Sequence, residues 1–198
     1  MLASLRARGY SLPMELVWPS RVYLPSYLAA LERGWSPDNV RGELARLDEL
    51  ARIQADADRF LASLVDREAL GPPLTLPDGS TAARLPGYRR WMWDGECVGT
   101  IGFRWQPGTN ALPPHVLGHI GYAVVPWKRG RGYATAALRL LLPDARAEGL
   151  TAVDITVQPH NLASRHVIEA NGGVLVETFE APAAYGAHRS GLRYRIDL

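Results

Sequence analysis

The segment Tyr122–Ala134 joins an apolar run, a proline, a basic loop and an alanine-rich stretch in thirteen residues. The loop carries three cations and two glycines, namely Lys128, Arg129, Arg131, Gly130 and Gly132. Glycine adopts backbone conformations that other residues avoid, and a helix begins with N–H groups that have no intrahelical partner. The segment therefore predicts a strand, a tight turn and a helix start that together can bind a bulky anion such as pyrophosphate.

The totals indicate an ordinary globular chain. Its 198 residues are 47% hydrophobic and 21% charged, with a net charge of +2, which gives no support for a nucleic-acid partner. Cys97 is the one cysteine, so no internal disulfide can form, and its apolar neighbours predict a buried thiol. No apolar run reaches the roughly 18–20 residues of a membrane span, and the N-terminus lacks the apolar core of a secretory signal. We expect a cytoplasmic protein with no membrane partner.

The first part of the chain predicts one strand and two helices. A short strand is expected over Leu12–Trp18 and a short helix over Pro25–Arg33. Apolar residues then recur at three- and four-residue steps, which predicts a long helix from Asp38, its N-cap, to about Glu68. The turn residues of Gly71–Gly79 predict a loop, which is the best candidate for a domain boundary.

The rest of the chain predicts six strands and two helices. Asp94-Gly95 is a hairpin signal between strands at Tyr88–Trp93 and Glu96–Trp105, and Gln106–Pro114 is a loop. The further elements are strands at Gly118–Val125, Ala152–Val157, Val174–Glu180 and Leu192–Leu198, helices at Gly132–Glu148 and Leu162–Ala170, and a loop at Ala181–Ser190. Pro143 is expected to kink or shorten the first of these helices, and Asn161 to cap the second. This order predicts a single α/β domain over residues 1–198.

Two common phosphate motifs do not fit the loop. A P-loop needs a Gly-Lys-Ser/Thr ending that the chain lacks. A dinucleotide fingerprint needs a third glycine, where this chain has Thr135, and it follows the first strand of its sheet rather than a meander. A solvated basic turn and an arginine–glycine nucleic-acid tract are the remaining alternatives, and such tracts are repetitive whereas this one occurs once.

The run Arg129-Gly-Arg-Gly132-Tyr-Ala134 matches Arg/Gln-x-x-Gly-x-Gly/Ala and resembles the acetyl-CoA loop of the GNAT (Gcn5-related N-acetyltransferase) superfamily. Asn161-Leu-Ala-Ser164, followed by Asn171-Gly-Gly173, is similar to a second stretch of that family. The resemblance covers the chain from Leu12 onward and is tightest over 118–175. Within the superfamily the chain resembles a bacterial predicted-acetyltransferase group that carries a Gly-His-Ile-Gly-Tyr strand.

This resemblance implies a fold and a cofactor site. The fold is a mixed, mostly antiparallel central sheet flanked by helices, in which the strands Gly118–Val125 and Ala152–Val157 splay into a cleft. The pantetheine arm would bind backbone groups of Ala123, Val124 and Val125, and Asn161 and Ser164 would meet pantetheine or adenosine. Pyrophosphate would bind the backbone N–H groups from the loop to the helix start, those of Arg129, Gly130, Arg131, Gly132, Tyr133 and Ala134. The Thr135 hydroxyl would add a further hydrogen bond.

The resemblance also implies catalytic positions. His119 lies ten residues before Arg129, where the histone-acetyltransferase branch has a glutamate base, and an imidazole can serve there as general base. The alternative is a strand histidine bonded to the backbone, and His115 is a weaker candidate base. A backbone N–H of Val124 or Val125 would donate to the oxyanion. Ile168 stands where many members have a tyrosine acid, so water, Tyr133 or Tyr185 would reprotonate the thiolate.

The expected function is N-acetyl transfer from acetyl-CoA to a primary amine by direct attack in a ternary complex. Trp35 and Tyr185 are candidate contacts of a small-molecule or peptide acceptor, with His188 nearby in the sequence, although Trp35 can equally be buried under the long helix. No metal is implied, and a homodimer is left open. The alternatives are a non-catalytic acyl-CoA-binding module and, disfavoured by the charge, a nucleic-acid-binding protein.

Overall fold

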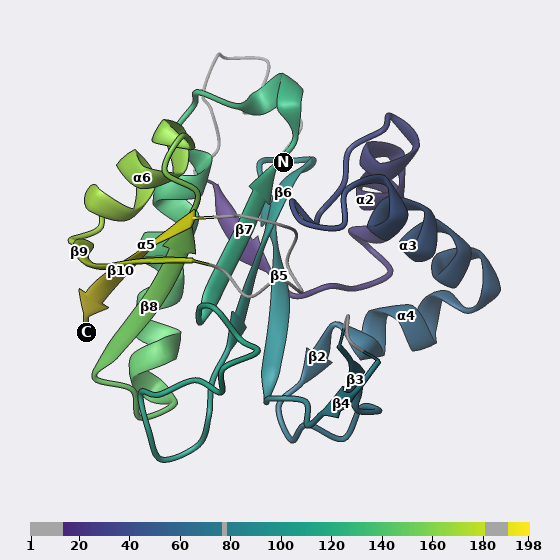
Figure 1. The fold of residues 1–198 in the computed structure, drawn as a ribbon. Coiled ribbons are helices and arrows are strands. Elements are labelled where there is room, and N and C mark those ends of the chain that lie inside the picture. The colour runs from purple at the N-terminus through teal and green to yellow at the C-terminus, as the bar shows by residue number, and fades with distance from the viewer. Residues whose placement is uncertain (1–13, 77–78, 181–189) are drawn as a thin grey trace. The chain divides into compact units, whose positions relative to one another are not determined.

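The computed structural model describes residues 14–76, 79–180 and 190–198 (Figure 1). The chain divides into two compact units, each assembled from three segments. The first unit comprises Met1–Leu64, Arg89–Ile101 and Tyr122–Ala137, and the second comprises Val65–Tyr88, Gly102–Gly121 and Leu138–Leu198. Within the described ranges, no helix is both long and apolar enough to span a membrane.

The described residues form five α-helices, one 3-10 turn and ten strands. The helices are α2 (Leu24–Glu32), α3 (Glu43–Ala55), α4 (Ala57–Ser63), α5 (Tyr133–Ala147) and α6 (Leu162–Glu169), and the 3-10 turn is η1 (Pro126–Lys128). The strands are β1 (Glu15–Val17), β2 (Val65–Asp66), β3 (Leu74–Thr75), β4 (Thr81–Ala82), β5 (Gly87–Trp93), β6 (Cys97–Arg104), β7 (Ile120–Val124), β8 (Ala152–Val157), β9 (Val174–Glu180) and β10 (Ser190–Asp197).

The strands pair in three sheets. One sheet has the order β1-β5-β6-β7 with β2 also pairing β5, a second has the order β8-β10-β9, and β3 pairs β4. The registers given by Leu16↔Met92 and Tyr194↔Ile155 belong to antiparallel ladders. In the described ranges β7 and β8 end different sheets, and no ladder joins them. The expected mixed, mostly antiparallel α/β fold is confirmed.

Aromatic packing forms the core of the first unit. Tyr27 of α2 stacks on Trp91 of β5 with ring centroids 4.4 Å apart, and Trp35 meets Tyr27 edge-on. Phe60 of α4 closes the same cluster, which is therefore built from three helices and a central strand. Figure 1 shows these helices, α2, α3 and α4, grouped together in purple to blue. Aromatic pairs of this kind bury large apolar areas and hold the helices on the strand.

A buried polar network lies against this core. Glu49 of α3 is 5% exposed, accepts a hydrogen bond from the Tyr27 hydroxyl, and pairs with Arg89 of β5 at 2.6 Å. Burial raises the pKa of Tyr27 well above its usual value, so this hydroxyl keeps its proton and donates. The network joins α2, α3 and β5 through one carboxylate, which would be a buried unpaired charge without its partners.

The second unit is organised around the β8-β10-β9 sheet. Tyr88, at the end of this unit's first segment, forms an aromatic group with Phe103 and Trp105, near the start of its second, and the Phe103 and Trp105 rings stack at 5.0 Å. Alternate residues of β10 carry charge, and Arg195 donates two hydrogen bonds of 2.8 and 3.0 Å to Asp154, the one charged residue of β8. Their neighbours Ile155 and Ile196 are buried, so one face of the sheet is apolar and the other is charged.

Most predicted elements are confirmed near their predicted bounds. The hairpin forms around Asp94-Gly95, Gly95 has φ +68°, and Ala152–Val157 and Val174–Glu180 are strands as predicted. The helix expected at Pro25–Arg33 is α2, and that at Gly132–Glu148 is α5. Helix α5 continues past Pro143 to Ala147, so the proline does not end it. The cap of α6 is confirmed, since Asn161 Oδ1 accepts the Ser164 N–H at 3.1 Å.

The single long helix predicted from Asp38 to Glu68 is wrong. The helix is interrupted at Asp56, whose backbone is extended. The Asp56 side chain caps α4 by accepting the Arg59 N–H. Asp38 accepts the N–H groups of Val40 and Arg41 in a turn, and α3 begins later, after Gly42 at φ +52°. Short polar side chains that bond the nearby backbone favour such breaks, which apolar periodicity does not reveal.

Three other bounds differ from the prediction. The loop Gly71–Gly79 contains β3, which pairs with β4. The strand expected over Leu12–Trp18 is the shorter β1, and residues 1–13 lie outside the described chain. The strand expected over Gly118–Val125 is reduced to β7, because the residues before it bond to β8 rather than continuing a regular ladder.

We predict that Glu49→Gln destabilises the protein by roughly 3 kcal/mol, because it leaves Arg89 without its carboxylate partner. The measurement is urea unfolding at neutral pH. The control is Asp48→Asn, one residue away, which removes an exposed pair with Arg52 at 3.7 Å and is expected to change stability by less than about 0.5 kcal/mol. Equal effects of the two substitutions would contradict a structural role for the Glu49 network.

We predict that Cys97 is inert to thiol reagents in the folded protein. The side chain is 3% exposed, and burial raises the pKa of its thiol to about 12, so little reactive thiolate exists at pH 8. Labelling by an aromatic disulfide should be at least about 100-fold slower in buffer than in urea, since only opened molecules react. Similar rates in the two conditions would show that the start of β6 is open to solvent.

Candidate functional site

The loop between β7 and α5 is held at both ends by the β5–β6 hairpin. Lys128, at the end of η1, pairs with Glu96 at 2.5 Å. Tyr133, the first residue of α5, donates its hydroxyl to Asp94. Burial and this hydrogen bond raise the pKa of Tyr133. The carboxylates of Asp94 and Glu96 therefore anchor the loop from outside it, so its shape does not depend on a ligand.

Glycine conformations set the shape of this loop. Gly130 has φ +74° and Gly132 has φ +78°, values that L side chains rarely adopt. A Cβ built on either glycine meets nothing within 4 Å, so both residues border open space. The first helical bond of α5 joins the Ala136 N–H to the Gly132 carbonyl at 3.0 Å. The N–H groups of Tyr133, Ala134 and Thr135 precede it, at the positive end of the helix.

The cations of the loop are partly engaged. Lys128 is neutralised by Glu96, and the Arg129 guanidinium folds back to donate from Nε to the Val124 carbonyl at 3.2 Å. Arg131 is exposed between the two glycines. Backbone N–H groups and the helix end therefore supply much of this loop's attraction for an anion.

Strand β7 has one backbone edge turned away from β6. The Val125 N–H donates to the Val98 carbonyl of β6 at 3.0 Å. Because neighbouring residues of a strand point their backbone groups to opposite sides, those of Tyr122 and Val124 face away from β6. Two side chains reach their carbonyls there: Asn39 Nδ2 donates to Tyr122 at 3.0 Å, and Arg129 donates to Val124.

This alternation places the backbone groups of two candidate residues, Val125 and Ala123, on the β6 side. Val125 was an expected oxyanion donor, but its N–H is committed to Val98, and the N–H that faces the edge belongs to Val124. Ala123 lies on the same side as Val125, so its backbone also faces β6. Gly99 of β6 accounts for the close approach of the two strands, since a Cβ there would lie 2.4 Å from the Ala123 carbonyl.

His119 lies directly before β7 and is buried, at 1% exposure. Its Nδ1 accepts the Asp154 N–H of β8 at 2.9 Å, and its own N–H donates to the Asp154 carbonyl at 2.7 Å. A nitrogen that accepts an N–H is unprotonated, so the ring proton is on Nε2, which is buried without a hydrogen-bond partner among the described residues. The role of His119 as general base stays a prediction, and it requires the ring to leave Asp154.

The other candidates fall in different places. Asn161 and Ser164 cap α6 in the second unit, and their contact with a ligand stays a prediction. Trp35 is 3% exposed and packs on Tyr27, so the packing alternative is confirmed and its ring is not presented to an acceptor. Tyr185 and His188 lie outside the described residues. Ile168 is fully buried, so the position of the expected tyrosine belongs to the core.

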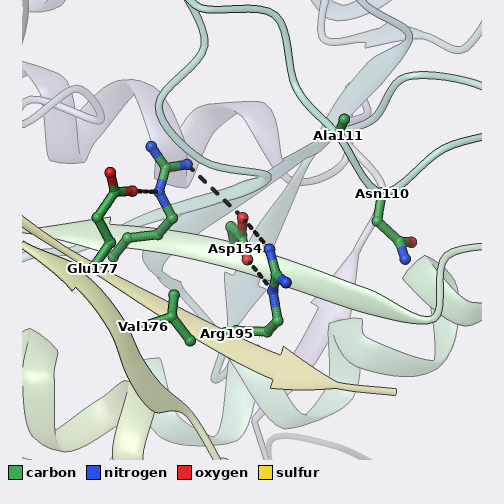
Figure 2. A pocket seen from close by; sticks show the side chains of 7 residues that line it. Asn110, Ala111, Asp154, Val176, Glu177 and Arg195 are labelled. Atoms are coloured by element: carbon green, nitrogen blue, oxygen red, sulfur yellow. Dashed lines mark hydrogen bonds and ion pairs between the residues drawn. The ribbon is translucent and has the colours of Figure 1, made fainter.

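A charged pocket lies on the exposed face of the β8-β10-β9 sheet. It has a volume of about 520 Å³. It is lined by Asn110, Ala111, Asp154, Val176, Glu177, Arg193 and Arg195. Figure 2 shows Asp154 between Arg195 and Glu177, and Glu177 pairs with Arg193 at 2.7 Å. Its charged side chains satisfy one another, and no group of three or more His, Cys, Asp or Glu residues in the described chain is arranged to hold a metal ion.

Comparison with known proteins identifies the family. The family model for GNAT acetyltransferases matches residues 49–172. The comparison with curated proteins gives no significant match. Among solved structures, the microcin C7 self-immunity acetyltransferase MccE, determined with acetyl-CoA and AMP, is 12% identical, with a TM-score of 0.60 over 93% of this chain and 92% of that chain.

Two further structures have the same fold. The ribosomal L7/L12 alpha-N-protein acetyltransferase RimL in complex with coenzyme A is 16% identical, with a TM-score of 0.60 over 95% of this chain and 96% of that chain. A GNAT-family acetyltransferase from Bordetella pertussis is 19% identical, with a TM-score of 0.54 over 94% and 98%. At these identities the likeness shows the fold, and the family model supplies the membership. The chain belongs to the GNAT acetyltransferase family.

Proposed function

We propose that this protein transfers the acetyl group of acetyl-CoA to an amine acceptor by direct attack in a ternary complex. The neutral amine attacks the thioester carbonyl carbon to form a C–N bond, the C–S bond breaks, and coenzyme A leaves as a thiolate. The nitrogen gives up a proton to water, and water returns one to the thiolate. The acceptor is a small molecule or a peptide amine, and we expect a cytoplasmic enzyme. Family membership supports the acetyl transfer, and the geometry of the loop before α5 supports the cofactor.

The observation that carries this proposal is the anchored glycine loop. Gly130 and Gly132 border open space at positive φ, and the N–H groups from Gly130 to Ala134 precede or begin a fifteen-residue helix. The Arg129 N–H already donates to the Pro126 carbonyl at 3.3 Å. Pyrophosphate would accept hydrogen bonds from the N–H groups of Gly130 to Ala134, and Thr135 would add its hydroxyl. The anchors at Asp94 and Glu96 mean that little conformational entropy is lost when the anion binds.

The outward edge of β7 would hold the pantetheine arm. The Val124 N–H would donate to the thioester oxygen as negative charge develops on it during attack. The Arg129 side chain covers the Val124 carbonyl in the structure, so cofactor binding would compete with that contact.

A second candidate function is a non-catalytic acyl-CoA-binding module. One observation favours it, because Ile168 is buried where many family members present a tyrosine acid. Coenzyme A is a good leaving group, so water can reprotonate the thiolate in the catalytic alternative, whereas the Tyr133 hydroxyl could do so only after it leaves Asp94. The two candidates separate in an assay of thiol release across a panel of amines, because only the enzyme turns over.

We predict that acetyl-CoA raises the Tm of the wild type and that Gly132→Glu abolishes this rise. The glutamate would place bulk and negative charge where the pyrophosphate binds. A ligand present at about 100 times its Kd stabilises the folded state by about 2.7 kcal/mol. The measurement is thermal unfolding with and without the cofactor.

The control for this prediction is Gly108→Glu. Gly108 has the same φ of +78° and the same open surroundings as Gly132, but it lies in the loop after β6. Both substitutions should cost about 1 kcal/mol of backbone strain. If only Gly132→Glu abolishes the rise in Tm with acetyl-CoA, the cofactor binds at the loop before α5. Absence of any shift in the wild type with both coenzyme A and acetyl-CoA would refute the proposed function and the acyl-CoA module together.

A further inference from the structure

The segment leading into β7 is joined to β8 by an unusual exchange of hydrogen bonds. A helical crossover such as α5 connects parallel strands, and the bond from the His119 N–H to the Asp154 carbonyl fits that arrangement. In a regular parallel ladder the Asp154 N–H would then donate to the carbonyl of Leu117. Instead, His119 Nδ1 accepts the Asp154 N–H at 2.9 Å. The side chain of His119 thus takes the place of a backbone carbonyl.

The displaced carbonyl has its own substitute partner. Arg193 of β10 donates from Nη1 to the Leu117 carbonyl at 3.2 Å, and from Nε to Glu177 of β9 at 2.7 Å. Both backbone groups that leave the ladder are therefore satisfied by side chains, which avoids the cost of burying them unpaired. Arg195 completes the arrangement by holding the Asp154 carboxylate through two hydrogen bonds, as Figure 2 shows.

Gly118 allows the segment to approach β8 closely at this junction. A Cβ at this position would lie 3.1 Å from the Asp154 carbonyl oxygen and 3.2 Å from the Thr156 nitrogen. These contacts are tighter than ordinary van der Waals distances, so with a larger residue the segment or β8 would have to shift by a few tenths of an ångström. On the other side, the His119 carbonyl accepts the Arg104 N–H of β6 at 2.9 Å. Residue 119 therefore binds β6 and β8 at once.

We propose that His119 is a positioning residue that fixes the segment leading into β7 to β8 by replacing a backbone carbonyl as the acceptor of the Asp154 N–H. It thereby determines where the outward edge of β7 begins, and this part rests on the proposed function, in which that edge holds acetyl-CoA. The required species is the neutral ring with its proton on Nε2. In that state the unprotonated nitrogen is committed to Asp154, so the ring does not accept a proton from the amine.

Matched substitutions separate positioning from base catalysis. His119→Asn places an amide oxygen near the position of Nδ1 and has no group at Nε2, whereas His119→Gln places its amide near Nε2. We expect the asparagine variant to keep the Tm, kcat and KM for acetyl-CoA within about threefold of wild type, because the acceptor is retained. The glutamine and alanine variants should lower the Tm and raise KM about tenfold or more. His166→Asn, at an exposed histidine of α6, is the control.

The opposite pattern would overturn the proposal. If all three variants lowered kcat by about 10²–10⁴-fold with unchanged Tm and KM, His119 would be the general base. Long-range 1H–15N NMR of the wild type gives a test that does not depend on activity, because it reports which ring nitrogen carries the proton. A proton on Nδ1 at neutral pH would also refute the proposal. If the wild type binds no acetyl-CoA, the proposed function fails, while the tautomer and the order of Tm values still test the junction.

The same junction predicts a pH dependence of stability. Burial lowers the pKa of His119, the positive charges of Arg104 and Arg195 act in the same direction, and the Asp154 carboxylate opposes them. The unfolded state therefore binds a proton at a higher pH than the folded state, so stability is lost as the pH falls below about 6.5. We expect the Tm of the wild type to fall more between pH 7.5 and 5.5 than that of His119→Asn, which has no ring to protonate. Equal falls in the two proteins would contradict the buried neutral ring.

Discussion

The hydrogen bond from the Val125 N–H to the Val98 carbonyl fixes which face of β7 is available for chemistry. Backbone groups alternate along a strand, so one bond to β6 assigns every neighbouring residue to the inner or the outer edge. Tyr122 and Val124 then face outward at an edge that ends its sheet in the described chain. An outward strand edge can bind an extended ligand through its backbone groups, although here the carbonyls of Tyr122 and Val124 accept hydrogen bonds from Asn39 and Arg129 that a ligand would have to displace. The proposed placement of pantetheine and of the oxyanion donor depends on this alternation of backbone groups along β7.

The loop before α5 depends on a different contribution, which comes from outside the loop. Glycines give Arg129–Gly132 its shape but also make it costly to order, because glycine loses more conformational freedom than other residues. Asp94 and Glu96 offset this cost by holding Tyr133 and Lys128 on the two sides of the glycines. Because Glu96 neutralises Lys128, the hairpin lowers the positive charge of the loop while it makes the loop more rigid. A preorganised set of backbone N–H groups loses less conformational entropy on binding pyrophosphate than mobile side-chain charges would.

The features that the sequence predicted correctly are those set by short local patterns. The hairpin at Asp94-Gly95, the cap at Asn161 and the glycine loop before α5 each depend on residues adjacent in the chain, and the structure has all three. The break at Asp56 was missed because a side chain that caps a new helix competes with an apolar periodicity that continues through it. The sequence also does not predict which residues of β7 point their backbone groups away from β6. Choosing between Val124 and Val125 requires the register with the partner strand, which the sequence does not state.

His119 illustrates the deeper limit of reading function from a position. Counting residues from Arg129 placed a titratable group at a site where relatives of another branch have a base, and the chemistry of imidazole suited that role. What the count does not contain is the hydrogen-bond partner, which is the backbone of Asp154, thirty-five residues away in the chain. A base needs an unprotonated nitrogen directed at the substrate, whereas a junction needs one directed at the protein. The same imidazole serves either purpose, and the direction of Nδ1 toward β8 favours the junction.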